Sequence, residues 1–144
     1  MNSRLHRYLS RLEDTIRSRR EIKIEKLEIF DLCQTRDRIS LFHARLRFPD
    51  GSLLQIRKVV ASKRWRINKL HYAYQYQDAS EQLVFRYDNA AHHPEIATHP
   101  DHKHTPSGID PANAPDLTDV LCEIDERVHE IRRRGEKDGE FDPV

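Results

Sequence analysis

Residues 39–60, ISLFHARLRFPDGSLLQIRKVV, decide the fold class, because they combine two runs of alternating side chains with a strong turn between them. From Ile39 to Phe48 apolar and polar residues alternate, which is typical of a strand with one buried face. Pro49-Asp50-Gly51 supplies three residue types that favour tight turns. Leu53 to Val60 then follow as a second alternating run. The stretch therefore predicts a β-hairpin.

Three further runs predict strands on either side of this hairpin. Residues 22–32 precede it, and their alternation changes phase between Ile24 and Leu27, which predicts a β-bulge. Residues 65–77 and 82–88 follow it and are joined by a short polar turn. Five consecutive strands with mostly short connections predict an antiparallel β-meander.

Helical periodicity is confined to the two ends of the chain. Residues 3–20 predict an amphipathic helix with Ser3 as its N-cap and an apolar stripe, formed by Leu5, Leu9, Leu12 and Ile16. A second helix is predicted after Asp116 and ends near Arg134, before a tail over residues 135–144. We therefore expect one α+β domain over residues 1–134. It has an N-terminal helix, a five-stranded meander, a long histidine-rich loop and a C-terminal helix packed on the sheet.

Composition indicates a polar cytoplasmic protein. Of 144 residues, 37% are hydrophobic and 34% are charged. No apolar run approaches the roughly 20 residues that span a bilayer, and the N-terminus lacks the apolar segment of a signal peptide. Cys33 and Cys122 lie far apart and match no CxxC pattern, which favours a reducing compartment.

The formal net charge of +1 hides an asymmetry along the chain. Residues 1–75 carry 18 basic and 8 acidic side chains, whereas residues 76–144 carry 7 and 16. A basic half can present a positive surface to an anionic polymer. The acidic C-terminal part can equally pack on the basic sheet, and the sequence leaves both interpretations open.

The polar sides of the predicted middle strands carry mostly cations. Candidate nucleic-acid-binding residues on them are Arg45, Arg47, Arg57, Lys69 and His71. A solvated surface normally mixes charge signs, so RNA or DNA is one reading of this basic face and a solvated face is the other. Tyr72, Tyr74 and Tyr76 alternate with these residues and are expected in the core, with base stacking as the alternative.

The predicted loop over residues 89–115 concentrates the histidines. Five of the nine lie within 13 positions, namely His92, His93, His99, His102 and His104. In an extended segment His102 and His104 project to the same side, which suits a shared general acid and base with Lys103 or Arg86 as the phosphate-binding cation. The same histidines can bind a divalent metal with Asp88 or Asp101, or serve only as hydrogen-bonding groups of the loop.

Residues 85–104, FRYDNAAHHPEIATHPDHKH, resemble the TumE family of toxins from bacterial toxin–antitoxin systems. The resemblance rests on RYDNA, HHPEI and HKH in this order. It departs from the family pattern at Ala91, where proline is expected, and at Thr98-His99-Pro100-Asp101, where an aromatic residue and a histidine flank the proline. It implies a protein antitoxin as partner, typically a helix-turn-helix DNA-binding protein, and RNA as the substrate by analogy with small basic toxins.

We therefore expect the toxin of a type II system that acts as a metal-independent endoribonuclease and needs no cofactor. The expected catalytic residues are His102, His104, Lys103, Arg86, Asp88 and His93. Two alternatives stay open: a non-catalytic module that binds nucleic acid or a partner, and a metal-dependent nuclease that uses the histidine cluster. The sequence also leaves a homodimer open.

Overall fold

The computed structural model describes residues 4–33, 38–64 and 66–139, in two compact units, Met1–Ala114 and Pro115–Val144. The first unit contains one helix, α1 (Arg4–Arg17), and a single sheet. The strands of this sheet are β1 (Lys23–Cys33), β2 (Arg38–Arg47), β3 (Leu53–Lys63), β4 (Arg66–Gln77), β5 (Leu83–Asp88), β6 (His102–Thr105) and β7 (Gly108–Pro111). The second unit contains the helix α2 (Leu117–Gly139).

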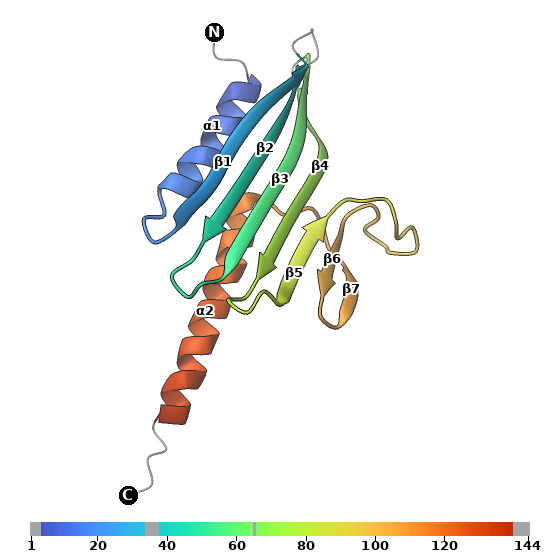
Figure 1. Ribbon diagram of the computed structural model, residues 1–144. Helices are drawn as coiled ribbons and strands as arrows, with labels where there is room; N and C mark the ends of the chain where they lie inside the picture. Colours follow the sequence, from blue (N-terminus) through green and yellow to red (C-terminus); the bar gives the residue numbers. More distant parts are fainter. Residues whose placement is uncertain (1–3, 34–37, 65, 140–144) are drawn as a thin grey trace, which may run out of the picture. The chain divides into compact units, whose positions relative to one another are not determined.

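The sheet is a meander in which strand order follows chain order from β1 to β7, and each neighbouring pair is antiparallel (Figure 1). The α+β class and the five predicted strands are confirmed. The predicted number of five strands was wrong, because the sheet has seven strands in the described residues. The two additional strands, β6 and β7, come from the segment that we expected to be loop.

The β6–β7 hairpin escaped prediction because it lacks apolar alternation. His102–Thr105 places polar side chains on both faces, so periodicity in hydrophobicity is absent. Its turn, Pro106-Ser107, joins Thr105 to Gly108, and Gly108 adopts a φ of 138° that favours glycine. Backbone pairing with β5, rather than burial of an apolar face, defines β6.

Two irregularities in the ladders decide which side chains share a face. The predicted bulge in β1 is confirmed: Ile24 pairs with Leu46 and Lys26 with Arg45, so Glu25 is the extra residue. A second register shift in β4 pairs Lys69 with Val60, whose side chain is buried in the core. Cross-strand partners share a face, so Lys69 lies on the opposite side of the sheet from the predicted basic face.

One face of the sheet is the hydrophobic core of the first unit. Three cross-strand rows form it, namely Phe42, Lys58 and Tyr72; Ala44, Ile56, Tyr74 and Tyr87; and Leu46, Leu54, Tyr76 and Phe85. Tyr72, Tyr74 and Tyr76 are at most 5% exposed, which confirms them as core residues rather than a base-stacking row. The three tyrosine rings of β4 therefore lie on the core face of the sheet and not on its opposite, polar face.

Helix α1 lies against β3 and β4 on this core face. Its predicted apolar stripe is confirmed, since Leu5, Leu9, Leu12 and Ile16 are all buried. The buried Lys58 ammonium donates a hydrogen bond to the Tyr8 hydroxyl at 3.0 Å and lies 5.0 Å from the centre of the Tyr74 ring. The predicted N-cap, Ser3, lies outside the described residues.

Helix α2 begins after Asp116, as predicted, and Asp116 and Asp119 exchange backbone-to-carboxylate hydrogen bonds of 3.0 and 2.8 Å at its N-terminus. The helix continues to Gly139, so residues 135–139 are helical where we expected a tail; residues 140–144 lie outside the described part. The predicted single domain over residues 1–134 stays a prediction, as does the packing of α2 on the sheet. No helix in the described ranges has a long enough apolar stretch to cross a membrane.

We predict that Ile56→Ala lowers the free energy of unfolding by about 2–5 kcal/mol, because it removes apolar atoms from a side chain that is 1% exposed at the centre of the core. Urea denaturation followed by circular dichroism measures the change. Leu70→Ala is the matched control, since Leu70 is 42% exposed and its truncation should cost less than about 0.5 kcal/mol. Equal losses for the two variants would contradict this core.

Candidate functional site

Two adjacent cross-strand rows form the polar face, on the side of the sheet opposite the core. The first row runs through His43, Arg57, Ala73, Asp88 and His102. The second row runs through Arg45, Gln55, Gln75, Arg86 and His104. The β5–β6 end of these rows carries a tightly connected group of ionisable side chains.

The carboxylate of Asp88 is the centre of this group. Its Oδ1 lies 2.9 Å from His102 Nε2, and its Oδ2 lies 2.9 Å from Arg86 Nε and 3.4 Å from His104 Nε2. Ala90 N–H donates a further hydrogen bond to Oδ1 at 3.0 Å. Burial alone raises the pKa of Asp88, but the hydrogen bonds from Arg86 and Ala90 and the nearby His102 and Arg86 outweigh burial and hold this pKa below its usual value. Asp88 is therefore a buried anion.

His102 is buried and held at both ring nitrogens. Its Nδ1 lies 2.8 Å from the Pro100 carbonyl oxygen, so Nδ1 carries a proton, because a carbonyl oxygen only accepts. Its Nε2 lies 2.9 Å from both His104 Nε2 and Asp88 Oδ1. Lone pairs on three such atoms repel, so at least one proton or a metal ion must lie between them.

His104 is the more accessible of the two imidazoles. Its pKa is lowered, chiefly by burial; the Asp88 charge opposes this shift, and His102, Arg86 and His93 reinforce it. Within the described residues its Nε2 has partners, whereas its Nδ1 has none. When Nε2–H is donated to His102 or Asp88, the lone pair of Nδ1 is available as a base.

His93 brings a third imidazole to the group. Its ring centre lies 5.4 Å from that of His102 and 6.0 Å from that of His104, and its Nδ1 lies 3.3 Å from a carboxylate oxygen of Glu95. One nitrogen from each of these three histidines lies within 4.8 Å of the others. Three imidazoles at this spacing, with the Asp88 carboxylate beside them, are suitable ligands for one divalent transition metal.

The loop before β6 is fixed by hydrogen bonds from Tyr72, Asn89 and Asp101. The Tyr72 hydroxyl donates to Asp101 Oδ1 at 2.7 Å, and the pKa of Tyr72 is raised above its usual range by burial and by this carboxylate. The Asn89 amide connects the Tyr72 N–H, at 3.0 Å, to the Leu70 carbonyl, at 3.2 Å. Asp101, a departure from the recognised motif, thus anchors the residue next to His102 to the core face.

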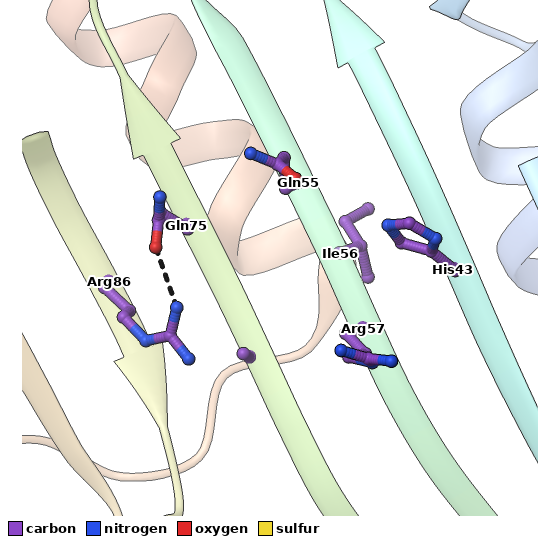
Figure 2. Close-up of a pocket in the computed structure, with 7 residues that line it drawn as sticks. His43, Gln55, Ile56, Arg57, Gln75 and Arg86 are labelled. Carbon is purple, nitrogen blue, oxygen red and sulfur yellow. Dashed lines mark hydrogen bonds between the residues drawn. The ribbon is translucent and has the colours of Figure 1, made fainter. Parts of the chain in front are cut away.

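Arg86 connects the histidine group to an open hollow on the same face. Its Nη1 donates to Gln75 Oε1 at 2.7 Å, as Figure 2 shows. The hollow has a volume of about 180 Å³ and is lined by His43, Gln55, Ile56, Arg57, Ala73, Gln75 and Arg86. A second hollow of about 270 Å³ shares Arg57, Ala73 and Arg86 with the first and continues to His71, Asp88 and Asn89. The two hollows are therefore contiguous.

A family model described as toxin TumE matches residues 12–134, which include every residue of this site. The chain belongs to the TumE toxin family. No curated protein and no solved structure matches the chain.

In this TumE chain five of the six predicted catalytic residues lie together: Arg86, Asp88, His93, His102 and His104. The sixth, Lys103, is on the other face of the sheet, where its ammonium lies 5.4 and 5.0 Å from the ring centres of Phe85 and Tyr87. The strand geometry of β6 is the reason, because neighbouring residues point to opposite faces. We therefore assign Lys103 no contact with a phosphate at this site.

The other two histidines of the predicted cluster stay at its edge. His99 lies outside the group of convergent imidazoles, with its Nδ1 3.1 Å from the His93 carbonyl oxygen, and His92 is exposed. Neither belongs to the set of nitrogen atoms that converge within 4.8 Å. The predicted metal-ligand set therefore narrows from five histidines to three.

The predicted nucleic-acid-binding residues divide among three environments. Arg45 and Arg47 form ion pairs with Glu25, at 3.0 and 3.2 Å. The hydrogen bonds of these pairs, with the larger effect from Arg47, lower the pKa of the Glu25 carboxyl. The bulge in β1 is what turns Glu25 toward them. Arg57 and His71 line the hollows, whereas Lys69 lies on the core face. Of the three predicted arginines, Arg57 alone is unpaired within the described residues.

We predict that Asp88→Asn lowers the pKa of His104 further, because the Asp88 charge raises this pKa against the effect of burial. Titration of the histidine side chains by long-range ¹H–¹⁵N NMR measures the shift. Asp78→Asn, in the turn between β4 and β5, is the matched control and should leave His104 unchanged. A rise in the pKa of His104 in Asp88→Asn would contradict the arrangement.

Proposed function

We propose that this chain is the toxin of a type II toxin–antitoxin system and that it cleaves RNA phosphodiester bonds without a metal. The observation that carries the proposal is the Asp88–His102–His104 group beside Arg86, which opens onto a hollow containing an unpaired arginine. Metal-free RNA cleavage requires a base, an acid and a cation near one phosphate. This part of the polar face offers all three.

In the proposed reaction His104 Nδ1 is the general base. A lowered pKa keeps this imidazole unprotonated at neutral pH, and it accepts the proton of the substrate's 2′-hydroxyl. The nearby Asp88 carboxylate stabilises the imidazolium that forms. His102 is a positioning residue, because it is buried and acts through its 2.9 Å contact with His104.

His93 is the proposed general acid, and Arg86 is the cation that stabilises the phosphorane. The bond between the 2′-oxygen and phosphorus forms as the bond from phosphorus to the 5′-oxygen breaks, and His93 donates a proton to this leaving oxygen. The products are a 2′,3′-cyclic phosphate and a 5′-hydroxyl end. Arg86 is half-exposed and keeps N–H donors that Asp88 and Gln75 do not use.

The proposed partner is an antitoxin protein with a helix-turn-helix DNA-binding fold. Membership of the TumE toxin family supports an antitoxin as partner. The helix-turn-helix fold is inferred from the usual composition of such systems. Copurification of the chain with the product of the adjacent gene tests this pairing directly.

We predict that purified wild-type protein cleaves single-stranded RNA and that His104→Ala reduces the rate at least about 100-fold, since a general base contributes about 10²–10⁴-fold. The measurement is gel analysis of a labelled oligonucleotide. A single 2′-deoxy substitution at the cleaved position should abolish cleavage there, because no 2′-hydroxyl remains to attack.

His129→Ala is the matched control, because His129 is an exposed histidine of α2 and is not one of the residues assigned to the site. Cleavage by His104→Ala at the wild-type rate would overturn the role of His104. RNA binding without cleavage by the wild type would instead support a non-catalytic binding module. Growth arrest on induced expression, lost in His104→Ala and kept in His129→Ala, would connect cleavage to toxicity.

A metal-dependent nuclease is the second candidate, and the convergence of His93, His102 and His104 within 4.8 Å favours it. When bound there, a divalent metal would supply Lewis-acid chemistry at the phosphate. The Pro100 carbonyl, which accepts a hydrogen bond from His102, is the kind of outer partner that orients a ligating imidazole.

We predict that EDTA leaves the cleavage rate unchanged, because the metal-free scheme places protons, not an ion, between the imidazoles. The rate is measured after dialysis against chelator and after addition of Zn²⁺ or Mn²⁺. Loss of cleavage in EDTA that a single divalent metal restores would replace the metal-free scheme with the second candidate. Metal content of the purified protein, by mass spectrometry, provides an independent readout.

A further inference from the structure

We propose that the hollow around Arg57 binds a nucleotide of single-stranded RNA next to the phosphodiester that is cleaved. The inference rests on the proposed RNA substrate and deepens it by assigning a flanking subsite to named residues. The subsite consists of Arg57 for a phosphate and of Gln55, Gln75 and His43 for the polar groups of the nucleotide (Figure 2).

Arg57 differs from the other arginines of the polar face in having no partner. Within the described residues, its guanidinium makes no hydrogen bond or ion pair, and the residue is exposed. Arg45 and Arg47 share Glu25, and Arg86 is held by Asp88 and Gln75. Arg57 therefore keeps its full set of N–H donors in a planar fork, which matches the geometry of a phosphate.

Besides Arg57 and Arg86, the first hollow is lined by three neutral polar side chains and by Ile56 and Ala73, and no acidic residue lines it. Gln75 Oε1 already accepts from Arg86, so the Gln75 amide presents N–H donors to the hollow. Gln55 on β3 is the cross-strand partner of Gln75 on β4. Burial and then the charges of Lys26 and Arg57 lower the pKa of His43, so at neutral pH its ring offers one donor and one acceptor.

The spacing in the sheet separates this subsite from the histidine group. Arg57 pairs with Ala73, and Ala73 pairs with Asp88, so the backbones of Arg57 and Asp88 lie two strands apart, about 10 Å. Ala73 has only a methyl side chain, and the second hollow runs past it from Arg57 to Asp88. A phosphate on Arg57 is thus next to the reacting one rather than identical with it.

Single-stranded RNA fits these walls better than a duplex or an acidic peptide. The edges and faces of bases are accessible to side chains mainly in single strands, whereas a duplex presents phosphates and sugars. A run of carboxylates would need several free cations, and the hollow offers one unpaired arginine beside amides and a neutral imidazole. An acidic segment of the antitoxin is the competing occupant.

The test is binding of a fluorescein-labelled 12-nucleotide single-stranded RNA of mixed sequence, followed by anisotropy at several salt concentrations. All proteins carry His104→Ala, and a gel verifies that the RNA stays intact. Adding Arg57→Ala should weaken binding at least about tenfold and reduce the slope of log affinity against log salt by about 0.7, the contribution of one phosphate contact. Arg57→Lys should keep the slope and recover part of the affinity, because it keeps the charge without the fork.

Two further variants separate the roles of charge and hydrogen bonding. Gln55→Ala should weaken binding about threefold with an unchanged salt slope, because it removes no charge. Arg11→Ala is the matched control, since it removes one exposed cation from α1, against the other face of the sheet, and should change affinity less than twofold. Equal affinity of the Arg57→Ala and Arg11→Ala proteins would overturn the subsite.

The outcome is independent of whether the chain cleaves RNA. If wild type does not cleave RNA but Arg57→Ala loses affinity and salt slope, the proposed activity fails and the hollow stands as a nucleotide-binding site. If wild type cleaves and Arg57→Ala binds RNA normally, the subsite alone fails. Poly-glutamate of equal charge tests the competing occupant: if it binds more tightly than the RNA in an Arg57-dependent manner, a peptide rather than a nucleotide is the occupant.

Discussion

The antiparallel pairing of β5 with β6 is the constraint on which the site depends. This register sets Asp88 opposite His102 and Arg86 opposite His104, so four ionisable side chains share one face within hydrogen-bond distance. A slip of one residue in β6 would move both histidines to the core face and Lys103 to the polar face. The anchoring of Asp101 by Tyr72, immediately before β6, opposes such a slip.

The buried carboxylate of Asp88 connects the elements of this site chemically. Burial of an anion is unfavourable unless it is paired, and here one carboxylate has Arg86, His102, His104 and the Ala90 N–H around it. Because these partners come from β5, β6 and the loop between them, the carboxylate fixes the loop as well as the imidazoles. The proton positions of the group are therefore coupled, which suits proton transfer and, equally, a metal ion.

Most arginines of the polar face are ion-paired, which the composition of this face does not indicate. A single bulge residue, Glu25, neutralises two of the arginines that would otherwise make a broad basic surface. The two hollows form a short path from Arg57 to Asp88, and His104 Nε2 lies 3.4 Å from the Asp88 carboxylate. Such a path is suited to a few nucleotides of the proposed single-stranded RNA.

The sequence by itself determined the α+β class, the five long strands with the bulge in β1, the buried face of α1, the tyrosine core and the family, since each depends on local periodicity or on a contiguous motif. It also identified Asp88 and four of the residues that surround it. Only the tertiary structure decided that β6 and β7 join the sheet, because polar strands formed through backbone pairing leave no apolar alternation in the sequence. The same pairing placed Lys103 on the other face, and a bulge moved Lys69 away from the basic face. Which arginine stays unpaired was likewise decided by Glu25 across a strand, and cross-strand neighbours are set by register, which no local pattern specifies.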